Sequence, residues 1–175
     1  DSATASNGNK LQIKQTLKYA KALAIAQRAK NKQRVKAIHA KIKNTRQDLI
    51  HKFTTQLVKD NALIVVGDVK TTQFNSKKGK LAKSVYDAGW FELKRQLTYK
   101  CENAGCRFEI VNERYTTQTC SCCGDMSSSL SGRAGLRIRE WTCATCGTRH
   151  DRDINASRNI LAVGLDRLVE GIPER

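Results

Sequence analysis

Two Cys-x-x-Cys pairs constrain this chain more than any other feature of its sequence. Cys120 and Cys123 form the first pair, Cys143 and Cys146 form the second, and nineteen residues separate the pairs. Four thiolates at this spacing are typical of a tetrahedral Zn²⁺ site in which each tight turn supplies two sulfurs. The alternative, four unrelated buried thiols, makes the spacing a coincidence. The sequence therefore predicts one structural zinc ion in a ribbon over residues 115–150.

The remaining cysteines and one histidine need separate interpretation. Cys101, Cys106 and Cys122 are an odd remainder, which fits a reducing cytosol better than a framework of disulfides. Cys122 lies inside the first pair and would bind metal only by breaking the two-residue spacing, so we expect it not to be a ligand. His150 follows the second pair. A role as a fifth ligand is open, but we expect a surface histidine or a phosphate contact.

The charge of the chain indicates a polyanionic partner. Its 175 residues include 32 Lys and Arg against 16 Asp and Glu, which gives a net charge of +16. Nucleic acid is the default partner for such an excess, and a solvated basic surface without a partner is the alternative. No apolar run approaches the ~20 residues of a membrane span, and no secretory leader opens the chain. We therefore expect no membrane partner.

Residues 17–59 have a helical pattern without Pro or Gly. Apolar residues recur at intervals of three, four and seven, and the length favours a helical hairpin that breaks near residues 30–32. The other faces are rich in Lys and Arg. This favours a surface that follows a phosphate backbone over an ordinary soluble helix pair. The candidate nucleic-acid contacts on this hairpin are Lys32, Arg34 and Lys41.

A short apolar run at residues 62–66 predicts a buried central strand whose carboxyl end presents Asp68. Open α/β folds usually place their chemistry at that edge. The basic loop that follows, residues 71–80, adds Lys77 and Lys78 as candidate nucleic-acid contacts. The other expected elements are a hairpin that turns at residues 7–9, a helix over 82–102 ended by Gly105, a strand over 107–113, a ribbon strand over 136–142 and a helix from Asp153.

Three motifs near the end of the chain resemble the C-terminal half of the TnpB (OrfB) family. They are YTTQTCSCCG from Tyr115, WTCATCG from Trp141 and DRDINASRNIL from Asp151. The segments KSVYDAGW and LTYK are similar to the stretch that precedes the ribbon in that family. TnpB proteins are transposon-encoded, RNA-guided DNA endonucleases related to type V CRISPR effectors. The similarity runs from about residue 1 to residue 164.

The resemblance implies an α/β, RNase H-like (RuvC) fold that is incomplete at its N-terminus and carries a long basic helical hairpin and an inserted four-Cys zinc ribbon. It implies a RuvC-like part at residues 1–114, the ribbon at 115–150, and the last RuvC motif with its helix at 151–175. DNA and a guide RNA are the implied partners, and Mg²⁺ or Mn²⁺ is the implied catalytic metal. The implied location is the prokaryotic cytoplasm, in association with the nucleoid.

Two-metal hydrolysis of a phosphodiester needs several carboxylates at one point. The family uses an Asp on the first strand, a Glu that ends a central strand and an Asp that opens the last helix. Asp153 matches the last of these, although spacing alone favours Asp151 and Asp153 as helix caps. The first Asp is expected upstream of residue 1. Gly67 stands where the Glu belongs, and the neighbouring Asp68 would point away from the site unless the strand bulges.

Three functions therefore stay open at the level of the sequence. The chain is the nuclease portion of an RNA-guided DNA endonuclease, or a nuclease-deficient RNA-guided DNA-binding relative or remnant, or a plain zinc-ribbon nucleic-acid binder. The first requires a relocated acid in place of the missing Glu. Asp87 and Glu92 are the alternatives that the sequence offers besides Asp68.

Overall fold

The computed structural model describes residues 2–13, 15–68, 89–135 and 137–170. These residues form two compact units. The first unit contains residue 2, residues 11–61 and residues 89–106, and the second contains the rest of the described chain. Among the helices in these ranges, none has the length and apolar content needed to cross a membrane.

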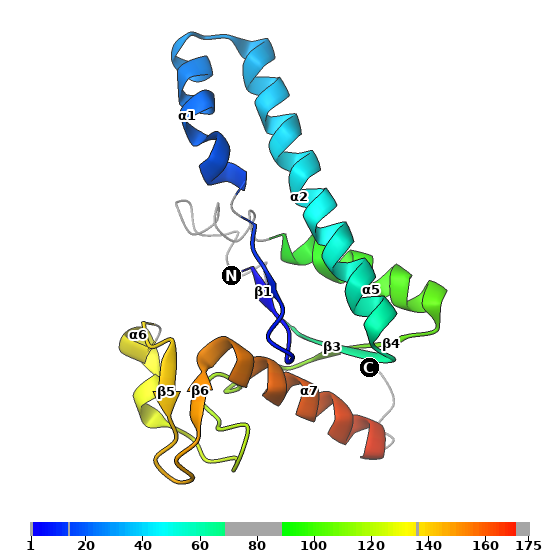
Figure 1. Cartoon of the computed structure of the whole chain (residues 1–175), viewed down its shortest axis with the longest axis vertical. Coiled ribbons are helices and arrows are strands. Elements are labelled where there is room, and N and C mark those ends of the chain that lie inside the picture. The colour runs from blue at the N-terminus through cyan, green and yellow to red at the C-terminus, as the bar shows by residue number, and fades with distance from the viewer. Residues whose placement is uncertain (1, 14, 69–88, 136, 171–175) are drawn as a thin grey trace. The chain divides into compact units, whose positions relative to one another are not determined.

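A helical hairpin dominates the first unit (Figure 1). Helix α1 (Gln15–Arg28) and helix α2 (Lys32–Asp60) pack against each other. The break expected near residues 30–32 is confirmed: Lys30 adopts a φ of 50°, and Asn31 Oδ1 caps α2 by accepting a hydrogen bond of 2.9 Å from the N–H of Arg34. The hairpin is held together by the buried residues Ala26, Ile38 and Ile42, with Tyr19, Ala22, Leu23 and Val35 packed around them.

Helix α5 (Trp90–Ala104) completes this unit by packing on α2. The predicted end at Gly105 is confirmed, because Gly105 adopts the left-handed φ of 67° that glycine tolerates and its N–H caps the helix. The predicted start at residue 82 lies outside the described residues. Polar groups cross the buried helix contact: the Thr54 hydroxyl donates to Gln96 Oε1 (3.0 Å), and Lys100 Nζ donates to Thr54 Oγ1 (2.7 Å).

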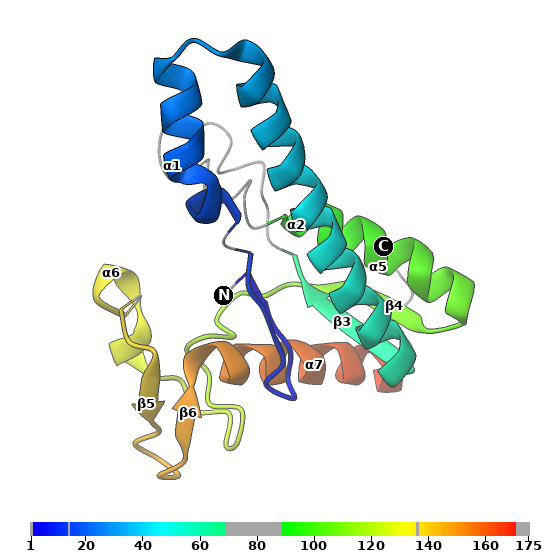
Figure 2. The ribbon, with the colours of Figure 1, turned by 45° about the horizontal axis from the view of Figure 1, so that its top comes forward.

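Two parallel strands and one helix form the centre of the second unit. Strand β3 (Leu63–Gly67) pairs with β4 (Arg107–Val111), with Gly67 opposite Val111, so both carboxyl ends meet at one edge. Within the described chain, β4 is the only neighbour of β3. Helix α7 (Arg152–Glu170) lies against both strands (Figure 2). Gly164 allows this approach, since a Cβ there would lie 2.7 Å from Val65 Cγ1.

The predicted N-terminal hairpin is confirmed as β1 (Ala3–Thr4) and β2 (Lys10–Leu11). Its turn has Gly8 at a φ of 88°, and the N–H of Ala5 donates to Asn9 O (2.8 Å). Within the second unit β1 lies next to α7.

The ribbon differs from prediction in its first strand. The expected strand over 136–142 is shorter: β5 is Glu140–Thr142, antiparallel to β6 (Arg149–Asp151). A 3₁₀ turn, η1 (Ser128–Leu130), and a short helix, α6 (Gly132–Gly135), precede it. The physical reason is the length of the partner, because β6 has three residues before α7 begins and offers no ladder to a longer strand.

Candidate metal centre and carboxylate site

The four cysteines of the predicted ribbon come together in space. The sulfurs of Cys120, Cys123, Cys143 and Cys146 all lie within 4.8 Å of one another. The Sγ atoms of Cys120 and Cys146 are 3.7 Å apart, as are those of Cys123 and Cys143. Four sulfurs at ~2.3 Å from a tetrahedral zinc ion lie about 3.8 Å apart. The donor set therefore fits one tetrahedral metal ion.

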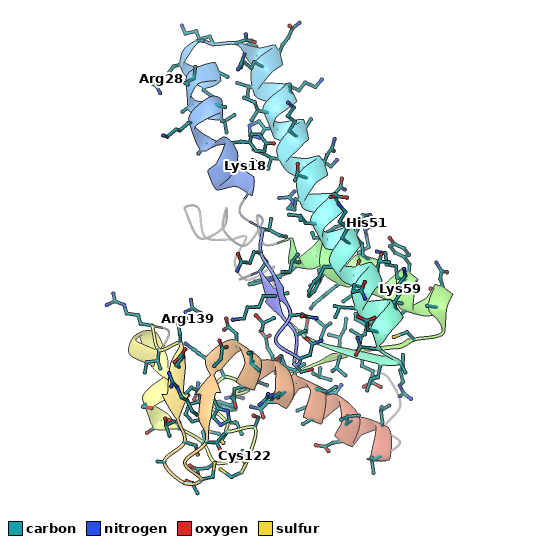
Figure 3. The ribbon with its side chains drawn as sticks, in the orientation of Figure 1. Lys18, Arg28, His51, Lys59, Cys122 and Arg139 are labelled. Carbon is teal, nitrogen blue, oxygen red and sulfur yellow. The ribbon has the colours of Figure 1, made fainter. Side chains whose placement is uncertain are left out.

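The two knuckles are built in the same way from local hydrogen bonds. The N–H of Gly124 donates to Cys120 O (2.9 Å), and the N–H of Gly147 donates to Cys143 O (3.0 Å). Both glycines have a positive φ, 77° and 72°, which glycine adopts without strain. Each tight turn thus aims two sulfurs at the same point, with one sulfur of each pair buried and the other exposed. Cys122, labelled in Figure 3, is exposed and is not part of this group.

Burial and hydrogen bonds change the acidity of the thiols in opposite directions. Burial raises the pKa of Cys120, although the backbone N–H groups of Cys123 and Cys122 favour its thiolate. The hydroxyl and the backbone N–H of Thr148 lower the pKa of the exposed Cys146 to about 6. Bound metal would stabilise all four thiolates far more strongly than these contacts.

The expectation of a surface histidine at position 150 is wrong. His150 is only 4% exposed, and its Nε2 lies 3.1 Å from Cys120 Sγ. Its ring packs on Trp141, with the ring centroids 4.8 Å apart, because β5 and β6 pair these two residues. Burial and the nearby Arg158 lower the pKa of His150. The imidazole therefore lies beside the metal site, next to one ligand, and is no phosphate contact at the surface.

Trp141 packs the interior of the ribbon. It is buried in one cluster with Cys120, Leu130 and Cys143. Leu130 comes from η1, in the segment between the two knuckles, and packs this turn against two of the cysteines.

An acid that the sequence reasoning missed lies at the edge of the β3–β4 pair. A Cβ built on Gly67 would lie 2.6 Å from Glu113 Oε2 and 3.2 Å from Ile160 Cδ1 of α7. Glu113 follows β4 by two residues, and Val111 is the partner of Gly67, so both positions share one face of the sheet. The carboxylate of Glu113 therefore lies where a side chain at position 67 would begin. The available signal was an acid at the carboxyl end of the strand predicted over residues 107–113.

The other acids named from the sequence fall into different environments. Asp68 is exposed, and its N–H donates to Val111 O (2.7 Å), which continues the ladder without a bulge. Strand alternation places it on the face opposite to Gly67. Glu92 belongs to the helical unit, where Arg95 donates to both of its oxygens (2.9 and 2.8 Å). Asp87 lies outside the described residues.

The start of α7 separates the roles of its two acids. Asp151 Oδ1 accepts hydrogen bonds from the N–H groups of Asp153 (2.9 Å) and Ile154 (3.0 Å), so Asp151 is the helix cap. Lys10 pairs with the same carboxylate (3.3 Å). Asp153 is half-buried, and Arg139 Nη1 lies 3.7 Å from its Oδ2. Ile160 is seven residues further on, so Asp153 projects from the face of α7 that meets Gly67.

The basic candidates lie on the helical unit or outside the described chain. Lys32, Arg34 and Lys41 are exposed along α2, while Lys77 and Lys78 fall in the undescribed stretch. Figure 3 labels further exposed cations on this unit, namely Lys18 and Arg28 on α1 and Lys59 on α2.

Two known protein families match different parts of this chain. Residues 3–77 match a family described as "Probable transposase" (OrfB_IS605), and residues 90–160 match the "Cas12f1-like, TNB domain" family. A Streptomyces pristinaespiralis protein named "Putative RNA-guided DNA endonuclease" is 41% identical over 146 residues, which are 83% of this chain and 35% of that protein.

Further similarity comes from one more sequence and one solved structure. The Escherichia coli K12 protein "Putative RNA-guided DNA endonuclease InsQ" is 32% identical over 149 residues, covering 77% of this chain and 36% of that protein. The chain thus spans about a third of the length of these relatives. Cas12f1, in the cryo-EM structure of its complex with sgRNA and target DNA, superposes with a TM-score of 0.63 at 15% identity over 84% of this chain and 41% of that chain. This likeness concerns the fold alone.

Proposed function

The chain belongs to the TnpB/OrfB family of transposon-encoded RNA-guided DNA endonucleases, and we propose that it supplies the RuvC-like nuclease and zinc-ribbon part of such an enzyme. The predicted α/β RuvC-like fold is confirmed by the likeness to Cas12f1 and by the four-cysteine cluster. The proposed reaction is metal-dependent hydrolysis of a DNA phosphodiester. Target DNA and a guide RNA are the proposed partners, in association with the prokaryotic nucleoid.

One observation carries the proposal of an active site, namely the position of the Glu113 carboxylate. The family pattern places a glutamate at position 67, where this chain has glycine. Glu113 Oε2 lies 2.6 Å from where Cβ of residue 67 would be, on the face that α7 covers. We therefore propose that this carboxylate, which follows the neighbouring strand β4, takes the role of the missing one. Asp68, on the opposite face, is a poorer candidate for this role.

Asp153 is proposed as the second catalytic acid. It projects from the same face of α7 as Ile160, which touches the Gly67 position. The catalytic acid opening the last helix in the family corresponds to Asp153, while Asp151 is occupied in capping α7. When Mg²⁺ or Mn²⁺ is bound, it supplies an activated water and neutralises charge on the leaving oxygen. Carboxylate oxygens are the ligands these hard cations prefer, so Glu113 and Asp153 fit the role.

The four-cysteine group is proposed to hold zinc. Its all-thiolate donor set and sulfur spacing favour Zn²⁺ over the hard cations of the carboxylate site. The ligands are Cys120, Cys123, Cys143 and Cys146. The ion is structural, because four protein ligands leave no open position for a substrate.

The exposed cations of the helical hairpin are proposed to contact a phosphate backbone, with Lys32, Arg34 and Lys41 of α2 among them. Lys77 and Lys78 remain proposed contacts on sequence grounds. The division into residues 1–114, 115–150 and 151–175 also remains a proposal.

Cleavage of target DNA by the full-length protein, purified with its RNA, tests this function in Mn²⁺. We expect cleavage that Glu113→Gln and Asp153→Ala abolish while RNA and DNA binding persist. Glu140→Gln, an exposed acid on the ribbon strand β5, is the matched control. Tight target binding without cleavage by the wild-type protein would instead identify a nuclease-deficient DNA-binding relative, in which Gly67 marks a lost ligand. Absence of guide RNA would leave a plain zinc-ribbon nucleic-acid binder.

A further inference from the structure

A buried asparagine on α7 joins three parts of the second unit. Asn155 is 1% exposed, and its Oδ1 accepts a hydrogen bond from the N–H of Ser121 (2.9 Å), inside the first knuckle. Its Nδ2 donates to Thr119 O (2.7 Å) and Thr116 O (3.3 Å). Both ends of the side chain amide are therefore used on the segment that leads into the ribbon.

A second asparagine repeats these contacts one helical turn later. Asn159 Nδ2 donates to the same two carbonyls, Thr116 O (2.8 Å) and Thr119 O (2.7 Å). Residues four apart on a helix lie on one face, so the pair forms a ladder along α7. Each of the two carbonyls thus receives two donors from α7.

The segment held by this ladder connects both candidate sites. At one end the Thr116 hydroxyl donates to Glu113 O (2.8 Å), which fixes the turn that carries the proposed catalytic carboxylate. At the other end it runs into Cys120, a proposed zinc ligand. The helix that supplies the ladder also carries Asp153, two residues before Asn155. The ladder thus ties the Glu113 turn and the first knuckle to the helix of the second acid.

We propose that Asn155 and Asn159 are positioning residues that couple the metal-bound ribbon to the alignment of Glu113 with Asp153. The part of this proposal that concerns the two acids rests on the function proposed above. The part that concerns the asparagine ladder and the ribbon does not depend on that function. Because Asn155 is buried, its hydrogen bonds have no water to replace them when they are lost, whereas Asn159 is half-buried. Loss of a supporting contact around a metal ligand typically weakens metal binding or activity about 10–100-fold.

The test compares Asn155→Ala and Asn159→Ala with Ser157→Ala in the full-length protein. Ser157 lies between them on α7, and its hydroxyl donates within the helix to Ile154 O, so it is the matched control. Asn159→Ala leaves Asn155 in place and is the milder change if Asn155→Ala fails to fold. Three measurements apply: hydrogen exchange at the Ser121 amide, the rate of zinc transfer to a chelator, and Mn²⁺ binding followed by electron paramagnetic resonance.

We expect Ser121 exchange and zinc transfer to rise about 10-fold in Asn155→Ala, and zinc transfer to rise by a smaller factor in Asn159→Ala. Mn²⁺ binding should weaken about 10-fold, and high Mn²⁺ should restore DNA cleavage in these variants but not in Asp153→Ala. If the two asparagines have a purely structural role, the variants should have a lower Tm but the same Mn²⁺ affinity as the wild type at temperatures well below Tm. That result would overturn the proposed coupling between the ribbon and the two acids. If Asn155→Ala and Asn159→Ala had the same Ser121 exchange rate and zinc-transfer rate as Ser157→Ala, the proposal that the asparagine ladder holds the ribbon would be overturned.

These measurements separate the inference from the proposed function. If the wild-type protein neither binds Mn²⁺ nor cleaves DNA, the proposed function and the alignment of the acids both fail. The exchange and zinc-transfer measurements still decide whether the asparagine ladder holds the ribbon.

Discussion

Glu113 Oε2 lies 2.6 Å from the point where a Cβ of Gly67 would be. Gly67 ends β3, and Glu113 lies two residues past the end of the parallel strand β4. The absence of a side chain at position 67 leaves room for the Glu113 carboxylate. Gly67 is not in the left-handed region, so its backbone accepts other residues.

Exchange of these two residues tests whether they share one role. Glu113→Gln should lower Mn²⁺-dependent cleavage by at least the ~100-fold associated with loss of metal-site contacts. Gly67→Ala should also lower it, because the new methyl group displaces the Glu113 carboxylate. The double variant Gly67→Glu/Glu113→Ala returns the acid to the position typical of the family and should recover activity. Recovery is measured as the cleavage rate at saturating Mn²⁺; no recovery with intact zinc content would contradict a shared role.

The zinc content of cysteine variants distinguishes the proposed metal ligands from Cys122, which lies in the first knuckle but is not expected to bind metal. Cys120→Ser or Cys143→Ser removes one of four sulfurs from the cluster, so zinc should be lost and the ribbon should unfold. Cys122→Ser should retain close to one zinc per chain, because Cys122 is exposed and outside the cluster. Elemental analysis of the purified variants provides the measurement. Zinc loss in Cys122→Ser would show that the ligand set is wrong.

His150 offers a test of how the buried thiolate of Cys120 is stabilised. An N–H donor 3.1 Å from the sulfur would offset its negative charge, and Phe would keep the packing on Trp141 without that donor. His150→Phe should therefore release metal to a chelator about 10-fold faster, with His150→Gln in between. His39→Gln, exposed on α2, is the control. The Co²⁺-substituted protein should keep its four-thiolate absorption spectrum in all variants; a changed ligand set would make His150 a ligand.

Glu92 makes a pH-dependent contribution to the stability of the helical unit. Hydrogen bonds from Arg95 lower the pKa of this carboxyl to about 2, from an ordinary value of 4.5. A lowered pKa contributes stability above the ordinary value and loses it as the pH falls toward 2. Glu92→Gln should therefore reduce the free energy of unfolding by about 1 kcal/mol at pH 7, since the pair is partly exposed to solvent. The difference from the wild type should shrink between pH 5 and 2.

Denaturant unfolding at pH 7, 4 and 2.5 measures this effect. Glu102→Gln, exposed on the same helix, is the control and should change stability little at any of these pH values. A difference between Glu92→Gln and wild type that stays constant with pH would show that the ion pair does not stabilise the helix.

Local chemistry explains the parts of the structure that the sequence predicted well. The break between α1 and α2, the end of α5 at Gly105, and the two knuckles depend on residues within a few positions of each other. Their hydrogen bonds and φ angles follow from Asn and Gly at the right places. The strand expected from residue 136 failed because strand length depends on the partner strand, which the sequence pattern of one segment does not contain.

The sequence by itself determined the four cysteine ligands proposed for zinc, the acid at the start of α7 and the basic helical hairpin. Each of these features depends on residues that are close together in the sequence. Only the tertiary structure decided that Glu113 occupies the space beside Gly67, that His150 lies against Cys120, and that Asn155 ties α7 to the ribbon. The two residues of each contact are 30 to 46 positions apart in the sequence. Strand register and helix packing bring such residues together, and neither is encoded in the spacing of any one motif.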